Sequence, residues 1–170
     1  MGLTDIAEGV SVTTRQRDRG VASVDRTGES LADQLAALDA DLPVEPDTAA
    51  TMAEAYAGGA SVGAVAEEAG VAPTTAAKTL HRLGFEGLSP FSPLEREILR
   101  DWLDAEVTRA DALDLTGASE REFALAAFVA THDAIEGAAE AVDGALSTSR
   151  DAMVAKRDAL AATLPDPDGV

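Results

Sequence analysis

Apolar residues recur at intervals of three and four positions from Ser30 onward, which is the spacing of one face of an α-helix. The first such stretch ends before Pro43. A second begins at a cap formed by Asp47 or Thr48 and ends near Gly58. The positions expected to face inward are Leu31, Leu35 and Leu38 in the first stretch, and Met52, Ala53 and Tyr56 in the second.

Two capping boxes mark helix starts in the second half of the chain. The first combines Ser92, Pro93 and Glu95, and the second combines Ser119 and Glu122. The helix that follows the first box has an apolar stripe, which we interpret as buried core rather than a cofactor site. The stripe consists of Leu94, Ile98, Leu99, Trp102 and Leu103.

The remaining segments give weaker signals. Thr108 is expected to cap a short helix that Gly117 ends. Beyond residue 132 the alanine-rich sequence predicts one or two helices, interrupted near Gly144 and over residues 147–149. Residues 1–28 show no clean period, although "GVSVTT" and "VASV" alternate briefly. A short hairpin and a partly ordered arm both remain open for that segment.

The stretch "SVGAVAEEAGVAPTTAAKTLHRLGF", residues 61–85, has the pattern of a helix-turn-helix. Ala66 supplies the small residue where two helices approach, and Gly70 supplies the residue that takes positive φ in the turn. Ser61 caps the first helix and Pro73 opens the second. Apolar residues occupy the positions that should lock the two helices together, namely Val65, Ala69, Val71, Ala76 and Leu80.

This stretch resembles the helix-turn-helix of bacterial and archaeal transcription regulators, and the whole chain resembles uncharacterised haloarchaeal proteins. The resemblance implies DNA binding by the second helix, residues 73–83, in the major groove. Carried over position by position, it assigns the outward, DNA-facing positions to Thr74, Thr75, Ala77, Lys78 and His81, with Arg82 toward the DNA backbone. This face offers no Arg, Asn or Gln for a bidentate contact with a base edge, which predicts modest sequence specificity.

These elements predict an all-α fold, a multi-helical bundle that contains a central helix-turn-helix and an irregular or short-hairpin N-terminal arm. We divide the chain into an arm with a short helix at 1–46, a helix-turn-helix domain at 47–88 and a C-terminal helical domain at 89–164. Residues 165–170 form an expected disordered tail.

An echo of the motif follows at residues 109–132, where Gly117 corresponds to Gly70. The positions that correspond to Lys78, His81 and Arg82 are Leu125, Phe128 and Val129. Because a helix that is apolar there cannot face phosphates, we expect it either to pack inside the protein or to pair with a second chain. A homodimer through the C-terminal helices is the sharper hypothesis.

Composition changes this picture mainly through charge. The 170 residues hold 31 acidic and 13 basic side chains, a formal net charge of −18, and only two of the basic residues are lysines, Lys78 and Lys156. The acids are spread over helix faces, which is typical of a solvated surface and resembles proteins that work in molar salt. A cation binder or nucleic-acid mimic would instead cluster its carboxylates.

Basic residues are concentrated at two places. Residues 72–85 contain Lys78 and Arg82 and no acid. The second concentration is in the N-terminal segment and consists of Arg15, Arg17, Arg19 and Arg26. It could enter a minor groove as a DNA-binding arm, or form salt bridges with the acidic body, and the second interpretation is slightly favoured.

Several functional classes are excluded by the residues present. The chain has no cysteine and two histidines without further ligands at metal-site spacing, and it contains no phosphate-binding loop or nucleophile elbow. We therefore expect no enzyme activity, metal or cofactor. With no apolar run long enough to span a membrane and no leader pattern, a cytoplasmic protein is expected. The predicted function is binding of double-stranded DNA in transcription regulation; the alternative is a protein-interaction module that uses the apolar helix at 119–131.

Overall fold

The computed structural model describes residues 29–38 and 42–163, and every regular element within them is a helix. The predicted all-α, multi-helical class is therefore confirmed. The expected N-terminal arm at 1–28, including its arginines, and the expected tail at 165–170 lie outside the described residues.

The first structural unit consists of α3 (Pro46–Ala57), α4 (Val62–Ala69) and α5 (Pro73–Arg82). The helices meet on a small core made of Met52, Val65, Ala66, Ala76, Leu80 and Leu88. Tyr56 and Phe85 close one side of this core, with their ring centroids 5.1 Å apart in an edge-to-face arrangement. The unit thus contains the predicted helix-turn-helix and its supporting helix.

The second unit consists of α6 (Pro93–Leu103), α7 (Arg109–Thr116) and α8 (Glu120–Thr131). Its core is more aromatic and consists of Phe91, Leu99, Ala112, Phe123 and Ala126. The Phe123 ring lies at its centre, edge-to-face with Trp102 at 5.1 Å and with Phe91 at 5.9 Å. These contacts confirm that the Trp102 stripe serves packing.

The two units repeat one another along the chain with a constant offset. Corresponding helices begin 47 residues apart, at 46 and 93, at 62 and 109, and at 73 and 120. Gly70 and Gly117 end the middle helix of each unit with φ of 67° and 65°. The two cores are filled by side chains of different size: the buried position that Ala76 occupies in the first unit is occupied by Phe123 in the second. The echo seen in the sequence therefore extends to a complete three-helix repeat.

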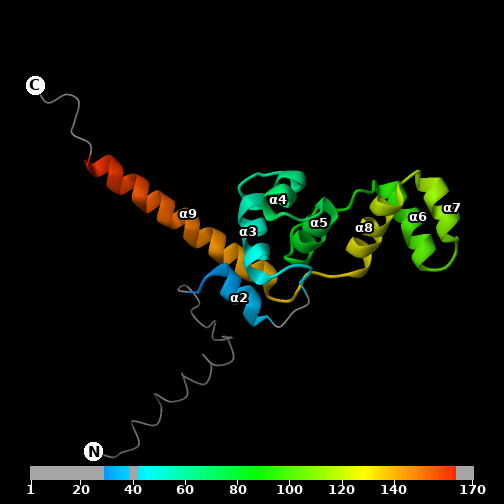
Figure 1. Ribbon diagram of the computed structural model, residues 1–170, viewed down its shortest axis with the longest axis horizontal. Coiled ribbons are helices and arrows are strands. Elements are labelled where there is room, and N and C mark those ends of the chain that lie inside the picture. Colours follow the sequence, from blue (N-terminus) through cyan, green and yellow to red (C-terminus); the bar gives the residue numbers. More distant parts are fainter. Residues whose placement is uncertain (1–28, 39–41, 164–170) are drawn as a thin grey trace, which may run out of the picture.

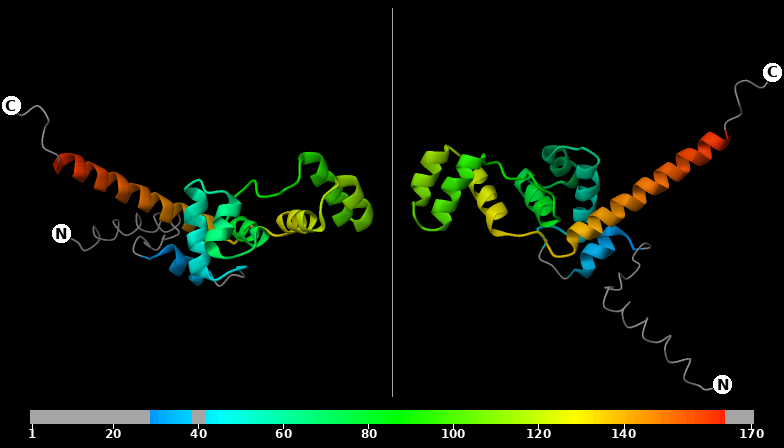
Figure 2. Two further views of the ribbon diagram at one scale, coloured as in Figure 1. Left: turned by 45° about the horizontal axis from the view of Figure 1, so that its top comes forward. Right: turned by 180° about the vertical axis from the view of Figure 1, so that it is seen from behind.

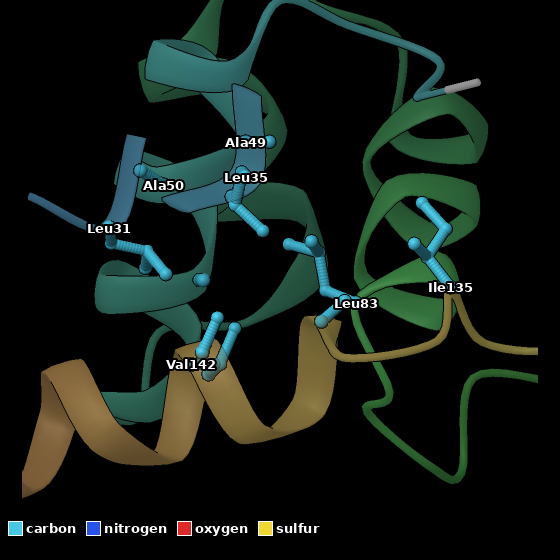
Figure 3. Close-up of a cluster of buried hydrophobic side chains, with 10 residues drawn as sticks. Leu31, Leu35, Ala49, Ala50, Leu83, Ile135 and Val142 are labelled. Carbon is cyan, nitrogen blue, oxygen red and sulfur yellow. The ribbon is translucent and has the colours of Figure 1, made fainter. Parts of the chain in front are cut away.

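A third cluster joins the two ends of the described chain. Here α2 (Leu31–Ala37) and the first turns of α9 (Ala138–Thr163) pack against α3. Figure 3 shows Leu31 and Leu35 of α2 beside Ala49 and Ala50 of α3, with Val142 of α9 below them. The sequence assigned residues 89–164 to one C-terminal domain. In the structure only α6, α7 and α8 form a unit there, because α9 packs with α2 and α3 instead.

The last helix runs without a break from Ala138 to Thr163, so the predicted interruption near Gly144 and residues 147–149 is wrong. A glycine costs a helix only about 1 kcal/mol, and the surrounding alanines offset that cost. The Thr148 hydroxyl also donates a hydrogen bond of 3.0 Å to the Gly144 carbonyl one turn back. Figures 1 and 2 show the outer part of α9 extending away from the body, at the end opposite the second unit.

Most predicted helix ends are confirmed, and a few positions differ. The side chains of Ser30, Ser61 and Thr108 cap α2, α4 and α7. In contrast, α3 begins at Pro46 with Glu45 as its N-cap, two or three residues before the expected cap at Asp47 or Thr48. Leu94 and Leu103 are 67% and 40% exposed, so the interpretation of the α6 stripe as buried core is wrong at these two positions.

Both predicted capping boxes are present. Ser119 donates to the Glu122 carboxylate through its hydroxyl at 2.6 Å and its backbone N–H at 2.9 Å, and Ser92 caps α6 in the same way. The hydrogen bonds from Ser119 lower the pKa of the Glu122 carboxyl below its ordinary 4.5, and those from Ser92 lower that of Glu95. Because the pKa is lowered, each box stabilises the fold above about pH 4.5 and its contribution is lost as the pH falls through the folded-state pKa.

A first prediction concerns Gly70, the left-handed residue of the turn between α4 and α5. Gly70→Ala places a Cβ at φ of +67° with open space around it, so the cost is backbone strain alone. We expect a loss of about 1–2 kcal/mol in the free energy of unfolding, measured by thermal or denaturant unfolding followed by circular dichroism.

Gly144→Ala is the matched control. Gly144 lies inside α9, and a Cβ there also meets open space, but its backbone is helical. This variant should gain about 0.5–1 kcal/mol. Equal stability of the wild type and Gly70→Ala would show that the turn does not depend on the left-handed conformation.

Candidate nucleic-acid interface

The corner between α4 and α5 has the hydrogen bonds of a tight helix-turn-helix. Ser61 Oγ accepts from the Ala64 N–H at 3.2 Å, and the Val71 N–H donates to the Ala66 carbonyl at 3.0 Å across the turn. Buried Val65, Ala76 and Leu80 then fix α5 against α4. The predicted turn and packing positions are thus confirmed.

The predicted DNA-facing residues of α5 are only partly accessible. Thr74, Thr75, Lys78, His81 and Arg82 are all half-buried. Ala77 is 4% exposed, so the expectation that it faces outward is wrong. Ala77 lies one helical turn before His81, whose ring contacts Phe128, so we attribute its burial to α8, which packs along α5.

Phe128 of α8 provides the main side-chain contact with α5. The Lys78 ammonium lies 4.9 Å from the centroid of the Phe128 ring, a cation–π geometry. The His81 ring approaches the same phenyl group edge-to-face, with centroids 6.4 Å apart. On its other side the phenyl group stacks on His132 at 4.0 Å. One aromatic ring therefore engages two of the predicted DNA-binding side chains.

His81 and Phe128 occupy equivalent positions in the two repeats, since they lie 47 residues apart. The contact shows that equivalent helices of the two repeats, α5 and α8, pack against each other. Figure 1 shows the two helices meeting between the outer helices of their units.

The loop after α8 is attached to the last turn of α5 by three hydrogen bonds. His81 Nε2 lies 2.5 Å from the His132 carbonyl oxygen, so Nε2 is the donor. The Arg82 guanidinium donates to the Asp133 carbonyl. The Ile135 N–H donates to the Arg82 carbonyl at 2.8 Å. Arg82 is thus held by backbone oxygen rather than by a carboxylate.

The charged side chains of α5 itself are all basic. No acid lies within α5 itself, and Lys78 and Arg82 form no ion pair with a carboxylate of the described residues. The ion pair found among those residues joins Arg109 of α7 to Glu120 of α8. The two basic side chains of α5 are therefore not neutralised by a carboxylate, although Lys78 faces the Phe128 ring and Arg82 the Asp133 carbonyl.

The sequence left two roles open for the apolar side chains of α8, packing inside the protein or pairing with a second chain. The structure shows packing within the chain. Leu125, Phe128 and Val129 are half-buried, and the Phe128 contacts with α5 lie within one chain. The sequence did not reveal which segment α8 packs against, because α5 and α8 are far apart along the chain.

A cavity of about 500 Å³ lies at the junction of the two units, and no pattern in the sequence predicts it. Side chains from α5, the connecting segment, α6 and α8 line it, including His81, Phe85, Phe91, Arg96 and Val129. Among the described residues, no group of three or more His, Asp or Glu could hold a metal ion. The same part of the chain contains no helix long and apolar enough to cross a membrane.

A family model described as "Family of unknown function (DUF7858)" matches residues 1–169, almost the whole chain. The chain belongs to the DUF7858 family. Comparisons of this DUF7858 chain with curated proteins and with solved structures gave no match.

Proposed function

We propose that this DUF7858 protein binds double-stranded DNA through α5 and acts as a cytoplasmic transcription regulator. The observation that carries the proposal is the α4–α5 corner, with its left-handed Gly70 and its buried Val65, Ala76 and Leu80. This corner joins a short capped helix to a second helix whose sequence contains basic residues and no acid.

The side chains of α5 suggest distinct roles. Thr74 and Thr75 are half-buried in the first turn of α5, where hydroxyl groups can bond phosphate or a base edge. Lys78 can reach guanine or phosphate as a point charge, and His81 and Arg82 lie nearer the DNA backbone. Ala77 is buried in the described arrangement and would contribute only after α8 moves.

The acidic surface is compatible with this proposal if the protein works in molar salt, as halophilic proteins do. At 1 M salt the Debye length is about 3 Å, so carboxylates elsewhere on the molecule do not repel DNA at a distance. Only charges in direct contact with the duplex then matter. Lys78 and Arg82 are such charges, and no carboxylate of the described residues neutralises them.

The alternative, docking of another protein onto the helix at 119–131, has less support. Phe128 on that helix is engaged by Lys78 and His81 of the same chain. A partner protein would have to displace α5 before it could use this face.

The DNA-binding proposal makes a direct prediction. Replacing Lys78 and Arg82 with Glu should abolish binding to labelled genomic fragments in a gel shift or anisotropy assay at high potassium chloride, because two attractive contacts become repulsive. The matched control replaces Lys156 and Arg157 with Glu, which changes the net charge equally on exposed positions of α9. Circular dichroism should show both double variants folded, and equal binding by the α5 variant would contradict the assignment.

Homodimerisation through the C-terminal helices is a second part of the proposal. In α9, Met153 is 71% exposed and Val154 is 53% exposed, both beyond the turns that pack on α2 and α3. A two-fold dimer could place two α5 helices one DNA turn, about 34 Å, apart.

Sedimentation at high salt tests the dimer. We expect a concentration-dependent dimer for the wild type and a monomer for the variant with Asp at both Met153 and Val154, because carboxylates would be buried at the interface. The variant with Asp at Leu115, an exposed apolar residue of α7, is the matched control and should still dimerise. A strict monomer for the wild type would remove this part of the proposal.

A further inference from the structure

The contact between α5 and α8 is incompatible with reading a major groove. A helix with its side chains is about 10–12 Å across, and packed helices have axes about 8–10 Å apart. A major groove about 12 Å wide admits one helix, so the face of α5 that carries Lys78 and His81 must be free of other helices before α5 can enter it. With α8 on its DNA-facing side, α5 cannot enter the groove.

We infer that the described arrangement is a closed state in which α8 occupies the DNA-binding face of α5, and that DNA binding requires the second unit to move away. The inference rests on the proposed function of α5. In the closed state Phe128 covers the Lys78 ammonium and the His81 ring, two of the side chains assigned to DNA. DNA and α8 are then competitors for one surface.

The cores of the two units allow them to separate without unfolding. The first unit buries its own cluster around Met52 and Leu80, and the second buries its own around Phe123 and Leu99. Phe128 belongs to neither cluster. Opening therefore exposes the α5–α8 contact and leaves both cores intact.

The connections between the units suggest where the movement occurs. Gly84 cannot be the flexible point, because a Cβ there would lie 2.8 Å from the Cβ of Ala139, which shows close packing against α9. Leu88 packs in the first core, Phe91 in the second and Ile135 in the third cluster, so residues 89–90 on one side and 132–134 on the other are the segments that must change. The hydrogen bonds from His81 and Arg82 to the His132 and Asp133 carbonyls break in this movement.

Competition of this kind has a quantitative consequence. If only a fraction of molecules is open, the apparent dissociation constant for DNA is the intrinsic constant divided by that fraction. Removing a contact that exists only in the closed state raises the open fraction and tightens DNA binding. Phe128 is the residue of choice, since it contributes the cation–π and edge-to-face contacts and none of either core.

The test combines a distance measurement with DNA binding. The chain has no cysteine, so spin labels at Glu68→Cys in α4 and Asp114→Cys in α7, both exposed positions, report the separation of the two units. Binding is measured by anisotropy with fluorescent duplexes of randomised sequence in molar potassium chloride. Phe128→Ala is compared with Leu115→Ala, which removes an exposed apolar side chain of the second unit outside the contact.

We expect Phe128→Ala to lengthen the label separation and to bind duplex about fivefold to tenfold more tightly than the wild type. Leu115→Ala should leave both quantities unchanged. Adding duplex to the wild type should lengthen the separation in the same direction. Adding Lys78→Glu and Arg82→Glu to Phe128→Ala should keep the longer separation and remove the binding.

Two results would overturn the inference alone. The first is wild-type binding that Phe128→Ala does not improve although the units have separated. The second is an unchanged separation in Phe128→Ala, which would show that the ring does not hold the closed state; circular dichroism establishes that the variant is folded. Absence of DNA binding by every variant, including a visibly opened one, would instead overturn the proposed function on which the inference rests.

Discussion

The packing of α8 on α5 is the contact that makes one body out of two small helical units. Each unit spans about 40 residues and buries only a handful of side chains, a size at which a single core is marginal. The first unit gains further burial from α2 and α9, whereas the second has its contacts with α5 and the connecting loops. The surface that a DNA-binding helix would expose is therefore also the surface that supports the second unit.

The internal repeat brings equivalent helices of its two copies, α5 and α8, together at this contact. The copies have diverged at the contact, with Lys78 and His81 on one side and the apolar Leu125 and Phe128 on the other. Basic residues suited to a polyanion thus face an aromatic ring that attracts a cation more weakly than phosphate does.

Many helix starts and turns could be predicted from the sequence, because short-range interactions determine them. Ser61, Gly70, Pro73 and the two capping boxes each satisfy a backbone requirement within a few residues, and all appear as expected. The burial of Ala77 could not be predicted from the sequence, because it depends on α8, which lies far along the chain. The continuity of α9 through Gly144 differs from the predicted interruption because a glycine and a few serines are weak helix breakers among so many alanines.

A titration of DNA affinity against potassium chloride, with folding followed in parallel by circular dichroism, is the most direct test of DNA binding by so acidic a protein. A protein with few phosphate contacts loses little affinity through counterion release, while screening removes the repulsion from its carboxylates. Binding through α5 therefore predicts weak affinity at low salt that holds steady or strengthens toward molar salt. A steep, monotonic loss of affinity in a protein that stays folded throughout would contradict it.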